Sequence, residues 1–357
     1  LGNNALYSNT TASNNTAVGY QAGYASTTGI RLSFFGNQAG RNNTTGSYNS
    51  FLSDSAGYAV TSGAENTAVG YSAMANSTTA NYNTVVGKDA LVANTTGSLN
   101  TAIGYKAMYS HSGLGNSYHT AVGANALQSL TTGVRNTTLG YAAGYGITTG
   151  NYNVAIGMQA LQATGGTANG NTAVGYVSMF NTTTGANNTA VGYGSLLQNT
   201  TGQLNTAIGY DALTNNTTAN ANVAVGYQAL NDNTTGNNNV AIGYTSMENA
   251  TISNRNVAIG NFTLQELTTS GDTYNIAIGY AAGEFTTTGI RNTSVGGYSF
   301  NANTTGNYNI NMGHDSLSSS TNASHNSALG YKSMQSNTTG QYNTAVGSNS
   351  LLSNTTA

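Results

Sequence analysis

Cysteine, proline and tryptophan are absent from this chain of 357 residues, and only 5% of its residues are charged. A chain without cysteine has no disulfide bonds and no thiolate metal sites, although the absence leaves the cellular compartment open. Eight basic residues spread along the chain form no cationic stripe for a nucleic acid backbone, so nucleic acid binding is not expected. No apolar run reaches the roughly 18 residues of a membrane span, so this segment is not expected to insert into a membrane.

The residues that are present form one internal repeat. The sequence NTAVGY begins at Asn15 and returns, with small changes, from one end of the chain to the other. A glycine column from Gly2 to Gly347 marks 21 repeats, which are 17 residues apart except for two steps of 19 and one of 18. Only Ser53 replaces this glycine. Such periodicity predicts a single continuous array over residues 1–357 rather than several domains.

The residues just before the glycine have the alternation of a short β-strand. The preceding residue is apolar in all 20 repeats that have one, as at Val18 and Ile103, and the residue three before the glycine is Thr, Ser, Val or Ile. We expect both of these side chains to point into a core. The residue between them is Ala in 14 of the 20 repeats, so the same alternation predicts that this alanine faces outward.

The second half of the repeat supplies another corner. Four residues after the glycine comes Leu, Met or Phe, or else Gly, which predicts a second inward position. A Thr-Thr pair four residues later is interpreted as a second strand, followed by a second turn. Seventeen residues then make one two-sided coil, and the fold class is all-β: a parallel β-solenoid, or β-roll, of about 21 coils. The chain starts at Leu1 and stops at Ala357 partway through repeats, so we expect a fragment of a longer chain.

Stacking in register turns each repeated residue into a ladder. Asparagine stands four before the glycine in 18 of 20 repeats, with Leu32 and His119 as the exceptions, and its amides are expected to bond along the stack. Eleven of the 24 tyrosines directly follow the glycine. Two roles for these tyrosines remain open, because they can stack on one another as a cover for the corners or pack against another chain.

The alanine column suggests a candidate interface. A row of methyl groups flanked by small polar residues allows close approach of another surface, so we predict that this strip binds a second chain. The alanines of the predicted interface are Ala68, Ala102, Ala155, Ala173, Ala190, Ala207, Ala224, Ala241 and Ala258.

Asparagine followed by Thr-Thr also matches the N-glycosylation sequon. The candidate acceptors are Asn43, Asn94, Asn199, Asn216, Asn233, Asn303 and Asn337. A tight turn that selects Asn and Thr for backbone reasons generates the same triplet, and this interpretation is preferred.

The NVAIG and NTAVG cores, as at Asn153 and Asn343, resemble the head repeats of trimeric autotransporter adhesins. The longer form from Gly226 to Gly236 is similar to repeats of bacterial and phage tail-fibre-like surface proteins. The resemblance covers the whole chain, although the 17-residue period exceeds the adhesin repeat. It implies a left-handed β-roll, association of three chains, and a place on the cell surface, outside the cell or on a virion.

An active site requires unlike groups that converge, whereas this repeat offers rows of like groups. The four histidines fall at different repeat positions, and adjacent His314 and Asp315 are expected to point to opposite faces, so no metal site, cofactor or enzymatic activity is expected. The leading hypothesis is a structural extracellular fibre segment that acts as a spacer or filament. It associates with itself, as a homotrimer or end to end, and surface glycans are candidate partners. The alternative is an ice- or polysaccharide-binding solenoid that uses its Thr ladders.

Overall fold

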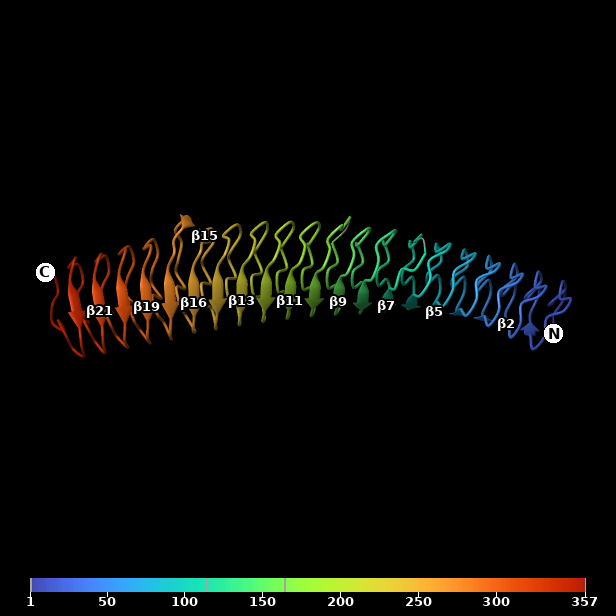
Figure 1. Cartoon of the computed structure of the whole chain (residues 1–357), viewed down its shortest axis with the longest axis horizontal. Helices are drawn as coiled ribbons and strands as arrows, with labels where there is room; N and C mark the ends of the chain where they lie inside the picture. Colours follow the sequence, from blue (N-terminus) through green and yellow to red (C-terminus); the bar gives the residue numbers. More distant parts are fainter. Residues whose placement is uncertain (1, 114, 164, 357) are drawn as a thin grey trace. The chain divides into compact units, whose positions relative to one another are not determined.

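The computed structural model describes residues 2–113, 115–163 and 165–356, and these residues contain no helix. They form two compact units, the first made of residues 1–177 and 182–184 and the second of residues 178–181 and 185–357. Within each unit, one three-residue strand per coil pairs in parallel with the strand of the next coil (Figure 1). The predicted parallel β-solenoid with a repeat of about 17 residues is therefore confirmed in each unit.

Each unit has ten strands in this sheet, counted over the described residues. In the first unit they are β1 (Thr16–Val18), β2 (Ser33–Phe35), β3 (Ser50–Leu52), β4 (Thr67–Val69), β5 (Thr84–Val86), β6 (Thr101–Ile103), β7 (Thr120–Val122), β8 (Thr137–Leu139), β9 (Val154–Ile156) and β10 (Thr172–Val174). In the second unit they are β11 (Thr189–Val191), β12 (Thr206–Ile208), β13 (Val223–Val225), β14 (Val240–Ile242), β16 (Val257–Ile259), β18 (Ile276–Ile278), β19 (Thr293–Val295), β20 (Ile310–Met312), β21 (Ser327–Leu329) and β22 (Thr344–Val346).

The glycine column ends each strand because two conditions exclude a side chain there. Gly226 has φ +135°, in a region that essentially only glycine adopts. A Cβ at this position would also collide with the carbonyl group of Gly243 in the next coil. Stacking of backbone on backbone at this corner therefore sets the 17-residue period.

The alanine column lies inside the coil, so the predicted orientation of the strands is wrong. Ala224 and Ala241 are completely buried, whereas Ile242, directly before a glycine, is 36% exposed. A three-residue strand directs only its central side chain inward, and the coil is thin enough that this side chain must be small wherever the second inward position holds a large residue. The flanking residues, one and three before the glycine, are the outer strand columns.

The second inward position is confirmed. Its side chain and the side chain at the strand centre complement each other in size. Met247 is fully buried within the coil whose strand carries Ala241. Where the strand centre is phenylalanine, the second position is glycine, because a Cβ on Gly57 would lie 2.5 Å from the ring of Phe51. This position has φ near +50°, which disfavours β-branched residues and explains the choice of Leu, Met, Phe or Gly.

The Thr-Thr segment is not a strand, contrary to the sequence interpretation. It forms a bend between the two corners of each coil. Outside the main sheet, two-residue strands pair in the second unit, β15 (Ser253–Asn254) with β17 (Gly271–Asp272). Single parallel bridges join Ser98 to Asn116 and Ile147 to Gly166 in the first unit. β17 lies in the extra length of a 19-residue coil.

The predicted asparagine ladder is confirmed and ties three coils together. The Asn66 backbone N–H and Nδ2 both donate to Oδ1 of Asn49 in the preceding coil, at 2.9 and 3.2 Å. Asn66 Nδ2 also donates to the carbonyl of Ala80 in the following coil, at 2.8 Å. Because these amides are buried, each satisfied bond stabilises the stacked state.

Candidate functional site

The outer strand columns form the surface that differs most from ordinary solvent-exposed sheet. In four successive strands of the second unit, β13, β14, β16 and β18, both outward residues are aliphatic and none is charged. These residues are Val223, Val225, Val240, Ile242, Val257, Ile259, Ile276 and Ile278. We call them the aliphatic face. The four isoleucines are exposed and the four valines are half-buried. A contiguous apolar surface of this kind marks an interaction site.

An aromatic ladder runs along the second unit at the corner that follows the strands. It consists of one ring from each of nine successive coils: Tyr193, Tyr210, Tyr227, Tyr244, Phe262, Tyr280, Tyr298, His314 and Tyr331. Tyr193 and Tyr210 stack with centroids 4.8 Å apart and planes 4° apart. From Tyr244 to His314 successive rings meet edge to face, with Phe262 and Tyr280 at 77°, and the last pair, His314 and Tyr331, is tilted by 38°. The predicted stacking of tyrosines is confirmed for the first four rings.

Two phenol groups of this ladder have raised pKa values. The neighbouring carboxylate of Asp211 is the main cause that raises the pKa of Tyr210. Partial burial in turn raises the pKa of Asp211. Burial is the main cause that raises the pKa of Tyr298.

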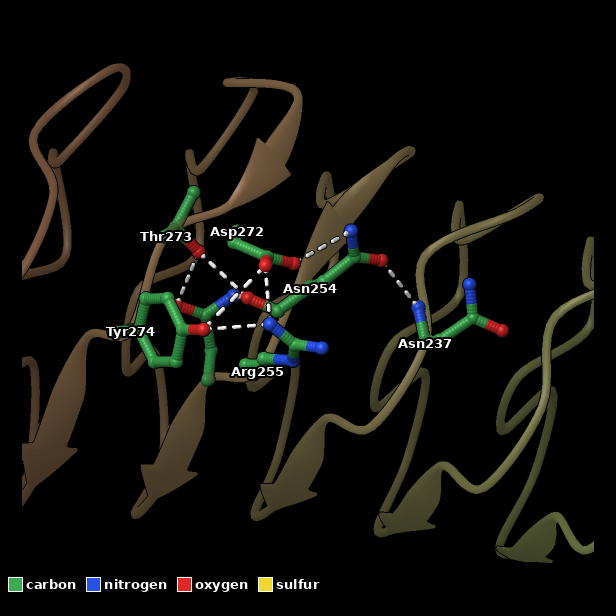
Figure 2. A network of polar contacts seen from close by, with 7 residues as sticks. Asn237, Asn254, Arg255, Asp272, Thr273 and Tyr274 are labelled. Carbon is green, nitrogen blue, oxygen red and sulfur yellow. Dashed lines mark hydrogen bonds and ion pairs between the residues drawn. The ribbon is translucent and has the colours of Figure 1, made fainter.

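A second exposed row, five residues before the glycine, alternates arginine and aromatic rings. Figure 2 shows its beginning, where Arg255 donates to the carboxylate of Asp272 and, at 2.6 Å, to the hydroxyl of Tyr274. Asn254 Nδ2 contacts Asp272 Oδ1 at 3.4 Å, so β15 and β17 share the network. Farther on, Arg291 donates to Tyr308 at 2.6 Å. The network fixes the enlarged loop of this coil to its neighbours.

The alanines predicted as a chain interface are not at the surface. Ala68, Ala102, Ala155, Ala173, Ala190, Ala207, Ala224, Ala241 and Ala258 each have no exposed area. Their methyl groups pack inside the coil, where another chain cannot reach them. The residues on either side of each alanine face outward instead. The sequence contained one sign that the strand centre faces inward, because the second inward position is Gly wherever the strand centre is Phe.

The candidate glycosylation sites are also buried. Asn43, Asn94, Asn199, Asn216, Asn233, Asn303 and Asn337 have no exposed area. Their side chains belong to a second internal ladder, in which Asn216 Nδ2 donates to Asn199 Oδ1 at 2.9 Å. They also close the turn, as Asn233 Nδ2 does with the carbonyl of Gly236 at 3.0 Å. The folded coil has no room for a sugar there, which agrees with the turn interpretation.

The two residues of each Thr-Thr pair differ in their surroundings. The first hydroxyl donates to the next coil, as Thr234 Oγ1 does to the carbonyl of Thr251 at 3.1 Å. The second residue, such as Thr235, is exposed. Each coil thus presents one Thr to solvent rather than a pair.

His314 and Asp315 are the adjacent titratable residues that the sequence singled out. His314 Nδ1 lies 3.1 Å from Asp315 Oδ2, so the expectation that these neighbours point apart is wrong, because both lie in a turn. The described residues contain no group of three or more His, Cys, Asp and Glu that could hold a metal ion. They also contain no helix long and apolar enough to cross a bilayer.

Comparisons with protein-family models, with curated proteins and with solved structures found no match, so the function must be argued from this geometry.

Proposed function

We propose that this chain is a structural segment of an extracellular filament and that copies of it associate laterally through the aliphatic face. The filament is of the kind used as adhesin stalks or tail-fibre shafts. The observation that carries the proposal is the aliphatic face itself, eight aliphatic side chains without a charge on four stacked strands. All-parallel sheets are usually covered on both faces.

A second copy of the chain is the occupant that best matches this face. The side chains recur once per coil, and the paired strands lie roughly 4.8 Å apart. A partner that contacts several coils in the same way must have the same spacing, which another solenoid of this sequence has. The absence of charge also removes repulsion between identical copies.

The internal ladders support a mechanical role. Each coil is joined to the next by backbone bonds, by the first asparagine column and by the threonine hydroxyls, as at Asn239, Asn256 and Thr234. Such repeated nearest-neighbour contacts suit an extended spacer.

The test is the number of chains per particle, measured by native mass spectrometry. We expect the wild-type chain to form multimers and Ile242→Lys with Ile259→Lys to be monomeric, because two buried cations would repel and lose solvation at the interface. Thr218→Lys with Thr235→Lys, on exposed residues of another edge, is the matched control and should remain multimeric. A folded wild-type monomer at high concentration would contradict the proposal.

The alternative of an ice- or polysaccharide-binding surface has less support. A flat hydroxyl array needs adjacent exposed threonines, whereas the first threonine of each pair is engaged with the next coil. Thermal hysteresis measured on the full chain would favour this alternative.

A further inference from the structure

The coil between β6 and β7 contains the two buried histidines of the described chain. His111 and His119 are 0% and 1% exposed. Each replaces a ladder asparagine: His111 stands where Asn94 stands one coil earlier, and His119 where Asn100 does. This coil is one of the two with 19 residues.

The two asparagine columns lie side by side inside the coil. In an ordinary coil, Asn49 Nδ2 contacts Asn43 Oδ1 at 3.3 Å. In the histidine coil, the same neighbourhood holds the imidazoles of His111 and His119, with ring centroids 5.1 Å apart and planes at 85°. The coil thus has a titratable pair at a place where other coils have uncharged amides.

The hydrogen bonds around His119 fit a neutral ring only. Its Nδ1 accepts from the backbone N–H of Asn136 at 3.1 Å, and its Nε2 lies 2.8 Å from the carbonyl of Gly133. A proton on Nδ1 would face the N–H donor of Asn136, so protonation must break that bond. The imidazole of His119 therefore keeps its hydrogen bond to Asn136 of the next coil only while the ring is uncharged.

The backbone of Thr131 is the one group that favours a protonated His111, and its effect on the pKa is smaller than that of burial. His111 Nε2 lies 3.2 Å from the hydroxyl of Ser117, while its buried Nδ1 has no hydrogen-bond partner. The side chains packed around the pair are neutral: Asn94 and Asn100 from the preceding coil, Leu130 and Asn136 from the following coil, and Ser117 from the same coil. The pKa of His111 is affected by one titratable group, His119, and neither histidine is affected by a carboxylate.

We propose that this coil is an acid-operated break point, in which protonation of His111 and His119 opens the solenoid locally between β6 and β7. The pKa values agree with the geometry. Burial, and secondarily the charge of His119, lowers the pKa of His111 from 6.5 to about 3. Burial lowers the pKa of His119 from 6.5 to about 4.

The direction of the pH effect follows from these values. Because the closed coil holds both rings neutral, the open coil binds more protons below pH 6.5, so stability is complete above that pH and falls in acid. The open fraction rises up to about tenfold per pH unit for each ring, hence about a hundredfold per unit for both. The increase ends once the pH falls through the pKa values of the closed coil.

Hydrogen exchange of the full chain tests the proposal. The amides of residues 104–123 should lose protection between pH 7 and about pH 4.5, after correction for the intrinsic exchange rate. The matched control is the other 19-residue coil, residues 260–279, which has Leu267 and Asn275 at the equivalent positions and should keep its protection. Equal losses in the two coils would overturn the proposal.

Two variants separate the titration from ordinary instability. His111→Asn with His119→Asn restores the usual ladder residues and should abolish the selective acid loss. If that pair does not fold, His111→Leu, which copies Leu130 and Leu267, should reduce the loss by about tenfold per pH unit. Acid opening that is unchanged in these variants would contradict the role of the histidines.

Discussion

The interiors of the two units are built in the same way, but their outer surfaces differ. In the first unit the earlier of the two outer strand residues is Thr or Ser in nine of ten strands, whereas in β13, β14, β16 and β18 it is aliphatic. The column directly after the glycine is interrupted in the first unit by residues such as Lys88 and Ala124. In the second unit Asn261 and Gly297 also interrupt it, but the next residues, Phe262 and Tyr298, supply rings, so nine successive coils have one. The first unit carries five basic and three acidic residues, and the second carries three and seven.

This difference shows where the repeat is free to vary. The glycine and the asparagine four residues before it are nearly constant, and the inner strand residue is most often alanine, because each must fit its own copy in the neighbouring coils. Positions that face solvent are not constrained in this way. We therefore infer that the aliphatic face and the aromatic ladder are properties of the second unit rather than requirements of the solenoid.

The largest expected effect tests the shared interior at the glycine column. Gly243→Val should cost about 3–5 kcal/mol of unfolding free energy, because Gly243 has φ +138° and a side chain would meet the backbone of the next coil. In the first unit, Ser53 already occupies this position at φ +119°, so Ser53→Gly should stabilise by about 1 kcal/mol. Urea unfolding followed by circular dichroism measures both free energies. The explanation of the glycine column would be refuted if Gly243→Val stabilised the protein and Ser53→Gly destabilised it.

The next effect concerns the buried asparagine ladder. Asn239→Ala should cost about 2–3 kcal/mol, because it removes the bond to the carbonyl of Ser253 and leaves two donors of Asn256 without their acceptor. Exposed Asn220, which also bonds between coils, is the control, and Asn220→Ala should cost less than about 1 kcal/mol. Equal losses of unfolding free energy in the two variants would show that burial does not decide the value of the bond.

The size match inside the coil can be tested by replacing the Phe and Gly combination with the Ala and Met combination of other coils. Gly57→Met should cost about 2 kcal/mol, since its side chain would overlap Phe51. Phe51→Ala in the same chain creates the Ala and Met combination of Ala241 and Met247 and should restore most of the lost stability. A double-mutant cycle on thermal unfolding measures this coupling, and simple additivity would contradict it.

The smallest expected effect compares a stacked tyrosine of the second unit with the equivalent tyrosine of the first unit. Tyr227→Ala should cost about 1 kcal/mol, because its ring stacks on both Tyr210 and Tyr244. Tyr105 occupies the equivalent position in the first unit, where its ring contacts the amino group of Lys106, and Tyr105→Ala should cost about half as much. A reversed order in the unfolding midpoints would argue against stacking as a source of stability.

The sequence predicted the period, the parallel coils and the first asparagine ladder because these depend on repetition and residue type. It did not predict which side of the strand faces inward. Alternation over three residues defines two faces, and hydrophobicity alone favoured residues such as Ile242 over Ala241 for the interior. The decision depends on the thickness of the coil, which admits only a small side chain opposite Met247. The occurrence of Phe51 together with Gly57 indicates that the strand centre and the second inward position share the interior. This indication appears only when the two repeat positions are compared with each other.

The buried histidines were missed for a related reason. His111 and His119 fall at different repeat positions, which gave no sign of proximity in the sequence. The two asparagine columns become neighbours only when the corner after the Thr-Thr bend is built, as the contact of Asn43 with Asn49 shows.

Electron cryo-microscopy of the purified chain tests the central claim most directly, because it shows how many chains share one cross-section and which residues meet. The account predicts several chains whose contacts include the aliphatic face, with Ile242 and Ile259 buried between copies. A single chain that leaves this face in solvent, or copies that meet through the exposed Thr235 edge, would contradict it.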